Sequence, residues 1–242
     1  MNNKLEALDK KCKEIEDLIR KNYVDENNLC EPIIDGIVNI EKYIQSNFRI
    51  LWILKEPYDD VEDGLPSGGG WHLSKDFLEA DGFYKRIGQS RSTWHPIIYT
   101  SYGILNDFIQ YDSMDYIRDD ENMAEIVRNV AFINVKKTPG LTRTYDNGVI
   151  WNAYSKHKHI LLKQIETYNP DIIIGGSTMP MFFDDLEIRD KQKNNGSVDF
   201  AIHNYRLFIH AYHPAQTKIT RDKYVDDIIN TVKLWKDGQK SL

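Results

Sequence analysis

Hydrophobic and polar positions follow two different patterns along the chain: helical spacing and unbroken apolar runs. Over residues 4–22, apolar side chains recur every three or four positions, which predicts an amphipathic helix. Pro32 can begin a second helix over residues 32–46, since proline is tolerated in the first helical turn. Residues Ile50–Leu54 then form an unbroken apolar run, which is typical of a parallel strand covered on both faces.

The rest of the chain alternates strands with helices. Three more apolar runs predict strands: VAFINV at residues 130–135, DIIIGGS at residues 171–177, and Tyr205–Tyr212. Helical spacing is found over Lys75–Ile87, Ile97–Tyr111, Trp151–Tyr168 and Asp222–Lys236. This alternation indicates one domain over residues 1–242, a three-layer α/β/α sandwich around a mainly parallel four-stranded sheet. Residues 1–48 would be an N-terminal helical extension packed on it.

Glycine and asparagine interrupt these patterns at two places. Residues 58–72 contain four glycines and a proline, which predicts a long mobile loop. Asn194, Asn195 and Gly196 predict a turn shortly before the last strand.

Composition narrows the class of protein. Hydrophobic residues make up 41% and charged residues 28% of the chain, as in globular proteins. No apolar run approaches the ~20 residues of a membrane span, and the N-terminus is too charged for a signal peptide. The two cysteines, Cys12 and Cys30, cannot supply the four thiolates of an iron–sulfur cluster. We expect a monomeric cytoplasmic protein without a membrane segment, a metal or another cofactor.

Charge is distributed unevenly between the two halves of the chain. The net charge is −6, but residues 1–120 hold 14 Lys and Arg against 23 Asp and Glu, whereas the remainder holds 17 against 14. Contacts to a polyanion would therefore come from the second half.

Polar residues of unusual character follow three of the predicted strands. The first strand runs into Lys55 and Glu56, the second ends at Asn134, and the fourth is followed by His213. Ligands of such folds bind beyond the carboxyl ends of parallel strands, so Glu56, Asn134 and His213 should converge on one cleft. A carboxylate, an amide and an imidazole together suit a small planar polar ligand such as a nucleobase.

Each of these residues also has a plain structural interpretation. Glu56 can be a solvated strand end, Asn134 can cap the following turn, and a His-Pro pair is often structural. The other histidines show no metal-ligand spacing; His157 and His159 would not share a helix face.

The three segments resemble motifs of the uracil-DNA glycosylase superfamily. LKEPYD, which includes Pro57 and Tyr58, occupies the place of a proline-centred motif such as GQDPYH, and Glu56 falls on its catalytic residue. AFINVKKTPG is similar to the second motif and aligns Asn134 with the base-reading Asn, while HPAQ aligns His213 with the His of HPSP. The similarity spans roughly residues 49–220.

The resemblance implies hydrolysis of the N-glycosidic bond of uracil or another damaged base in DNA, after the nucleotide is flipped out of the stack. Glu56 would hold a water and stabilise the oxocarbenium-like sugar, and His213 would donate a hydrogen bond to the departing base. Asn134 would read the base edge, with Trp71, Tyr58 and Pro57 around the base. The phosphate contacts would be the following second-half residues: Lys136, Lys137, Arg143, Gln216, Lys218 and Arg221.

Several departures from the family pattern support an alternative function. Leu54 and Lys55 stand where the first motif has glycine and its neighbour, and Glu56 is one methylene longer than Asp. Trp71 can pin its loop to the core instead of stacking on a base, and the lysines can be ordinary solvated charges. A catalytically inactive nucleotide- or nucleic-acid-binding protein on the same fold therefore stays open.

Overall fold

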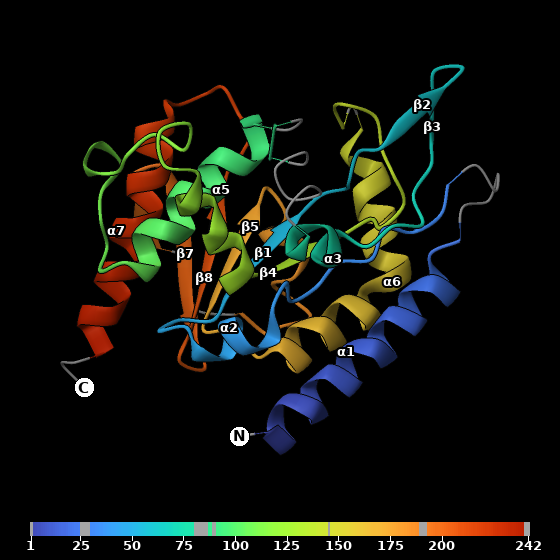
Figure 1. The fold of residues 1–242 in the computed structure, drawn as a ribbon, viewed down its shortest axis with the longest axis horizontal. Coiled ribbons are helices and arrows are strands. Elements are labelled where there is room, and N and C mark those ends of the chain that lie inside the picture. The colour runs from blue at the N-terminus through green and yellow to red at the C-terminus, as the bar shows by residue number, and fades with distance from the viewer. Residues whose placement is uncertain are drawn as a thin grey trace.

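A six-stranded sheet lies at the centre of the fold, with helices on both of its faces (Figure 1). In spatial order its strands are β4 (Ala131–Asn134), β1 (Ile50–Leu54), β5 (Ile172–Gly176), β8 (Arg206–Ala211), β7 (Val198–His203) and β6 (Lys193–Asn195). This computed structural model describes residues 2–24, 30–79, 87–88, 91–144, 146–188 and 193–239. The first four strands are parallel, and β7 and β6 are antiparallel additions.

The α/β class and the mainly parallel sheet agree with the prediction, whereas the number of strands does not. The sheet has six strands rather than four, because residues 193–203 form a β6–β7 hairpin that extends it beyond β8. The predicted turn at Asn194–Gly196 lies at the end of β6, and Gly196 has a φ of +62°. β6 is three residues long and polar, so it carries no apolar signal of its own.

Two apolar clusters fill the space between the sheet and its helices. Trp52 and Leu54 of β1 point into one cluster, and Leu51 and Ile53 point into the other. Successive side chains of a strand point to opposite faces, so a strand covered on both sides is apolar throughout. The unbroken run of Ile50–Leu54 is explained by this double burial.

The helices divide between the two faces. In chain order they are α1 (Asn2–Asn22), α2 (Ile40–Gln45), α3 (Leu73–Leu78), α5 (Arg91–Leu105), α6 (Asn147–Tyr168) and α7 (Arg221–Gln239), with short 3₁₀ segments η1 (Tyr111–Ser113), η2 (Glu121–Asn129) and η3 (Met179–Met181). α5, α7, α3 and η2 contribute to the first cluster, and α1 and α6 to the second. No helix of the described residues is both long enough and apolar enough to span a bilayer.

The helix predicted over residues 32–46 is much shorter in the structure, where α2 covers only Ile40–Gln45. The residues before it run in extended form along the outer edge of β4. Phe132 donates its backbone N–H to Gly36 (3.0 Å), and Ile33 donates to Lys137 (2.9 Å). Pairing with β4 outweighs the helical pattern, and it also covers the unpaired edge of the sheet.

The glycine-rich residues 58–72 contain a hairpin and are not one irregular loop. β2 (Asp60–Glu62) and β3 (Leu65–Ser67) pair across Asp63 and Gly64, whose φ angles are +51° and +79°. Positive φ at both turn positions is what a two-residue hairpin of type I′ requires, and Asp-Gly is a preferred sequence for it. The glycines that follow are held by the N-terminal segment, since Glu31 donates its N–H to Gly68 (2.8 Å).

Two helix predictions near the middle of the chain need correction. The helix expected over Lys75–Ile87 is α3, Leu73–Leu78, and residues 80–86 lie outside the described residues. The helix expected over Ile97–Tyr111 is α5, Arg91–Leu105, so it starts and ends six residues earlier. Pro96 lies inside α5, where the sequence pattern had suggested a boundary.

Candidate functional site

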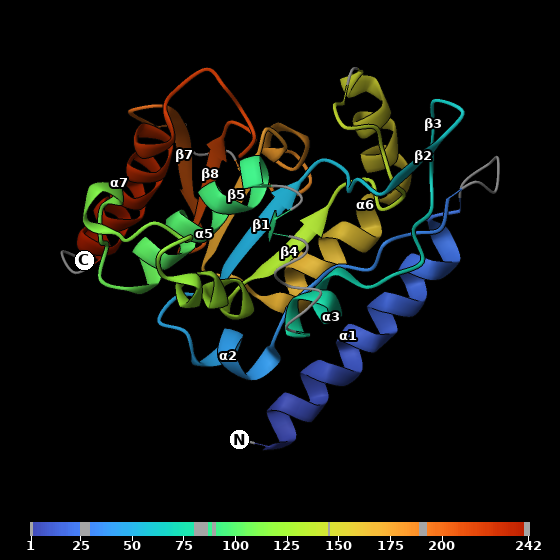
Figure 2. The same ribbon diagram turned by 45° about the horizontal axis from the view of Figure 1, so that its top comes forward.

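The parallel strands end together at one edge of the sheet, which we call the carboxyl edge. β1, β4, β5 and β8 are in parallel register there, and the arrows of β1 and β4 point the same way in Figure 2, toward the side of the β2–β3 hairpin. Helices α6 and α7 begin after β4 and β8, respectively. Glu56, Asn134 and His213 all follow or end parallel strands, so the topology assigns all three to the carboxyl edge.

Glu56 is held between two side chains and is not a solvated strand end. Its Oε2 accepts a hydrogen bond from Lys136 Nζ (2.9 Å) and its Oε1 accepts one from Thr144 Oγ1 (2.7 Å). Only 9% of the Glu56 side chain is exposed. The carboxylate therefore has a fixed orientation at the end of β1.

The backbone around Glu56 explains this position. Pairing of β1 with β4 continues past both strands, because Lys136 donates its N–H to Lys55 (2.9 Å) and Gly140 donates to Pro57 (2.8 Å). The two segments therefore run side by side. A Cβ at residue 140 would overlap the Glu56 carboxylate, so only glycine allows the backbone to approach this closely.

Lys136 is committed to the same small network. Besides Glu56, its ammonium donates to the backbone oxygens of Thr138 (3.2 Å) and Pro139 (2.7 Å). All three donors of an ammonium are thereby used. In this arrangement Lys136 fixes Glu56 and the following turn, and has no donor left for a phosphate.

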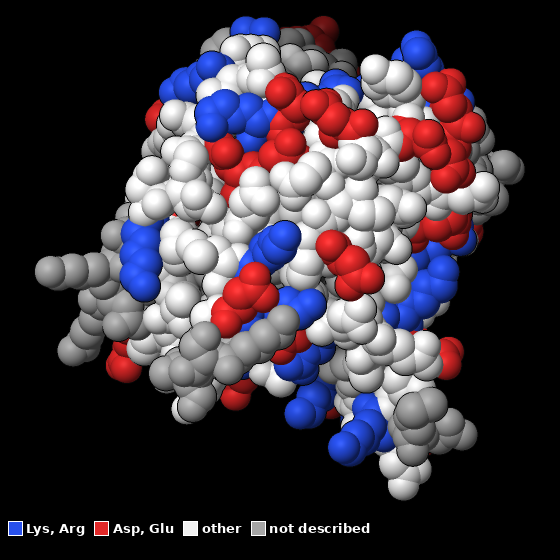
Figure 3. Space-filling model, turned by 90° about the vertical axis from the view of Figure 1, so that its left-hand side faces the viewer, with Lys and Arg blue, Asp and Glu red and all other residues white. Residues whose placement is uncertain are grey.

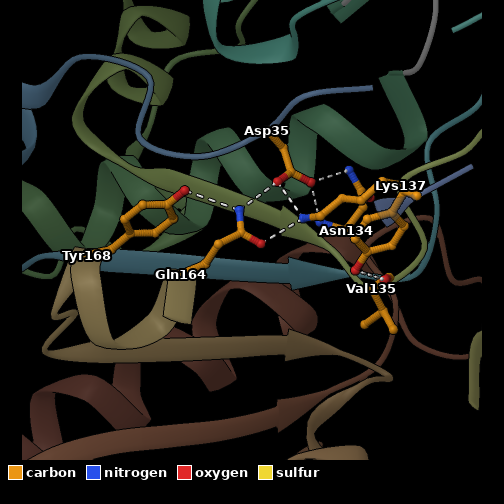
Figure 4. Close-up of polar contacts among 7 residues, drawn as sticks. Asp35, Asn134, Val135, Lys137, Gln164 and Tyr168 are labelled. Atoms are coloured by element: carbon orange, nitrogen blue, oxygen red, sulfur yellow. Dashed lines mark hydrogen bonds and ion pairs between the residues drawn. The ribbon is translucent and has the colours of Figure 1, made fainter. Parts of the chain in front are cut away.

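Asn134 is turned toward the N-terminal segment. Its backbone N–H donates to Asp35 Oδ2 (2.7 Å), and its side-chain Nδ2 lies 3.4 Å from the same oxygen (Figure 4). Asn134 is only 3% exposed. Its interaction with Asp35 replaces the predicted alternative, the capping of the following turn.

Lys137 lies in the interior, although it was expected to contact phosphate. Its Nζ donates to Asp35 Oδ1 (2.5 Å) and to Gln164 Oε1 (2.9 Å) (Figure 4). The Lys137 side chain has no exposed surface. Gln164 in turn donates to Asp35 and to Tyr168. Burial lowers the pKa of Lys137, and the attraction of Asp35 opposes that effect. A phosphate in solution cannot reach this ammonium.

The imidazole of His213 is neutral near pH 7. Burial, with a smaller contribution from the Lys55 ammonium, lowers the pKa of the imidazole from 6.5 to about 4. Ala215 donates its backbone N–H to Nδ1 (3.2 Å), so the neutral ring carries its proton on Nε2. Among the described residues, Nε2 has no recorded hydrogen-bond partner, so it is the available donor.

The loop after β8 holds His213 in place. Its backbone N–H donates to Ser177 Oγ (2.9 Å), and Ser177, at the end of β5, has a φ of +63°. Gly176 packs beside Pro214 and Leu54, so the ends of β5, β8 and β1 are in contact. Lys55 reaches the start of α6, where its Nζ donates to Asn147 Oδ1 (2.9 Å).

The aromatic residues predicted around a base have different environments. Trp71 packs against the core and its indole N–H donates to Asp59 Oδ2 (2.8 Å), which is the loop-pinning interpretation. Tyr58 is 47% exposed and pairs through its backbone with Gly140. Of the two, Tyr58 has the larger surface for a ligand.

The remaining predicted phosphate contacts lie outside the core. Gln216 uses its amide within its own turn, accepting from Lys218 N (2.6 Å) and Ile219 N (2.9 Å). Lys218 is exposed and its ammonium lies 5.1 Å from the ring centre of Tyr212. Arg143 and Arg221 are exposed. On the α7 side, the described surface mixes Lys and Arg with Asp and Glu and has no continuous basic area (Figure 3).

Sequence reasoning missed two residues that hold the site. The helix predicted over residues 32–46 includes Asp35, and Thr144 lies in a segment without a periodic pattern. The adjacent lysines give one indication that they have different environments. Successive side chains of an extended segment point to opposite sides, so Lys136 and Lys137 point away from each other. Nothing in the local sequence indicates that Asp35 is the partner.

Comparison with protein-family models and with curated proteins found no match. The described residues contain no group of three or more His, Cys, Asp and Glu side chains that could hold a metal ion.

Proposed function

We propose that the protein binds a nucleobase at the carboxyl edge and hydrolyses the N-glycosidic bond of uracil or another damaged base in DNA. The observation that carries the proposal is the imidazole of His213, which is neutral near pH 7 and directs its Nε2–H away from its Nδ1 contact with Ala215. A neutral donor can stabilise the negative charge that develops on a departing base without first losing a proton. The parallel strand order and the helices on both faces support the α/β/α arrangement that the resemblance implies.

Glu56 supplies the second element of this chemistry. The Lys136 ammonium and the Thr144 hydroxyl each occupy one lone pair of its carboxylate, and each oxygen keeps another that can accept from water. A carboxylate fixed in this way can stabilise positive charge on the sugar as the glycosidic bond breaks. Tyr58 offers exposed aromatic surface near the same turn.

The test uses oligonucleotides with a single uracil, as single strands and as duplexes, and scores abasic sites by alkaline cleavage. We expect cleavage by the wild type and a rate at least about 100-fold lower for Glu56→Gln and for His213→Gln. His203→Gln is the matched control, because His203 ends β7 next to the β7–β8 turn, at the opposite end of β8 from His213. No cleavage of uracil, hypoxanthine or alkylated bases by the wild type would exclude the hydrolase.

The second candidate is a nucleotide- or nucleic-acid-binding protein without hydrolytic activity. The observation that favours it is the close packing of the Gly140 backbone on the Glu56 carboxylate, which is only 9% exposed, because a hydrolase needs its carboxylate open to the attacking water. Fluorescence anisotropy with the same oligonucleotides separates the two. Binding that depends on His213 without any abasic product supports this candidate.

A further inference from the structure

The N-terminal segment reaches the candidate site through one carboxylate. Residues 33–38 hydrogen-bond to the outer edge of β4 through backbone groups, as in the bonds from Ile33 N to Lys137 O (2.9 Å) and from Val38 N to Val130 O (3.3 Å). At the carboxyl end of β4 the hydrogen bond is made by the side chain of Asp35 and not by its backbone. Its Oδ2 accepts the backbone N–H of Asn134 at 2.7 Å (Figure 4).

The same oxygen sets the orientation of the Asn134 side chain. Nδ2 lies 3.4 Å from Asp35 Oδ2, and an ionised carboxylate can only accept hydrogen bonds. The flipped amide would place Asn134 Oδ1 against this negative oxygen and is therefore disfavoured. Among the described residues, Oδ1 has no recorded partner, so the amide keeps an acceptor available.

Asp35 is itself held by the other carboxylate oxygen. Oδ1 accepts from Lys137 Nζ (2.5 Å) and from Gln164 Nε2 (3.0 Å), and the side chains of Asp35 and Lys137 have no exposed surface. Gln164 is fixed by a further bond from its Nε2 to Tyr168 (3.1 Å). A rigid chain of contacts thus runs from α6 to the end of β4.

We propose that Asp35 is a positioning residue that makes Asn134 present a hydrogen-bond acceptor to the base. This inference rests on the proposed function and adds the residue through which the site would favour a base with a ring N–H donor, such as uracil. The ring nitrogen of cytosine at the same position is an acceptor, and it would face Asn134 Oδ1 without a proton between them. A polar group left unpaired in this way gives strong discrimination. Asn134 is 3% exposed, so a base would contact only the edge of its amide.

The test compares Asp35→Asn with Gln164→Met. The first variant removes the charge that orients Asn134; the second disturbs the same buried network and leaves the contact between Asp35 and Asn134 in place. The readout is the ratio of kcat/KM for oligonucleotides with uracil and with cytosine at one position. We expect this ratio to fall about 10- to 100-fold in Asp35→Asn and to stay within about 2-fold in Gln164→Met.

Two results would overturn the inference: an unchanged ratio in folded Asp35→Asn, or an equal loss in Gln164→Met. Circular dichroism checks folding. If Asp35→Asn does not fold, Asp35→Asn with Lys137→Met, which removes both charges of the buried pair, takes its place.

Failure of the proposed function is recognised separately. If the wild type neither cleaves nor binds the uracil oligonucleotide, the position of Asn134 is read from its side-chain amide signals in ¹⁵N NMR spectra. A change of these signals in Asp35→Asn that is absent in Gln164→Met supports the positioning role. Signals that are the same in all three proteins refute it.

Discussion

Lys136 and Lys137 are neighbours in sequence and form ion pairs with very different surroundings. Lys136 pairs with Glu56 at the carboxyl edge, where the two side chains are 18% and 9% exposed. Lys137 pairs with Asp35 in the interior, where neither side chain has exposed surface. Both pairs hold a segment against the end of β4, since one fixes the turn after β1 and the other fixes residues 33–38.

The two ion pairs differ in the hydrogen-bond donors and acceptors that remain available to a ligand beside them. In the interior network Lys137 Nζ donates to Asp35 and Gln164, and Gln164 Nε2 donates to Asp35 and Tyr168, which suits a structural role. At the carboxyl edge, Glu56 retains free lone pairs and His213 retains a donor. The interior pair lies wholly inside the protein, whereas the pair at the carboxyl edge fixes a carboxylate that keeps some exposed surface.

The largest expected loss of stability follows from breaking the interior ion pair of Lys137 and Asp35. Lys137→Met leaves Asp35 as a buried charge without its ion-pair partner, so we expect the free energy of unfolding to fall by about 3–5 kcal/mol. Adding Asp35→Asn to Lys137→Met removes that charge and should recover part of the loss. Urea denaturation measures both variants. A double variant less stable than Lys137→Met would contradict this account.

Acidification should lower the stability of the protein through one histidine in each of the two regions. Burial lowers the pKa of His213, at the carboxyl edge, and of His157, stacked on Tyr23 beside the interior network, from 6.5 to about 4. Between these values the unfolded chain binds more protons than the folded one, so stability falls as pH drops from about 6.5 to about 4, by up to about 3 kcal/mol for each residue.

Urea denaturation of His213→Asn and His157→Asn at pH 7 and pH 5 tests this expectation. Each variant should lose less stability than the wild type on acidification, because one of the two neutral imidazoles has been removed. Identical losses in all three proteins would show that other groups control the acid response.

The ion pair of Lys136 and Glu56 should contribute less to stability than the interior pair of Lys137 and Asp35. Lys136→Met removes one charged hydrogen-bond donor of Glu56, and we expect a loss of about 1–3 kcal/mol in the free energy of unfolding. Because Glu56 then keeps only the Thr144 hydroxyl as a partner, the proposed release of uracil should slow even under conditions in which the variant is fully folded. Denaturation curves and abasic-site assays on the same preparation compare the two. An unchanged release rate would argue against positioning of Glu56 by Lys136.

The smallest effect is expected for an exposed cation. Arg143→Ala should change the free energy of unfolding by no more than about 0.5 kcal/mol. If Arg143 contacts a phosphate, the dependence of the logarithm of DNA affinity on the logarithm of salt concentration should lose about one unit of slope. Anisotropy titrations at several salt concentrations measure that slope. An unchanged slope would remove Arg143 from the predicted phosphate contacts.

Most of the fold could be predicted from apolar runs. The four parallel strands were located within a few residues because each is buried on both faces. The β6–β7 hairpin was missed because β6 is short and polar, and the helix at residues 32–46 was overextended because pairing with β4 competes with the helical pattern. The carboxyl-edge positions of Glu56 and His213 followed from the parallel sheet alone.

The sequence by itself determined the class of the fold, the parallel strands and the set of polar residues at their ends. Periodicity and burial decide which residue types occur at each position, so these features can be read from local sequence. Tertiary structure alone decided which of those residues stay available. Contacts between distant segments, Asp35 with Asn134 and Lys137 and Thr144 with Glu56, bury one lysine and fix the carboxylate. No local pattern encodes them, since each depends on where the folded chain places two remote segments.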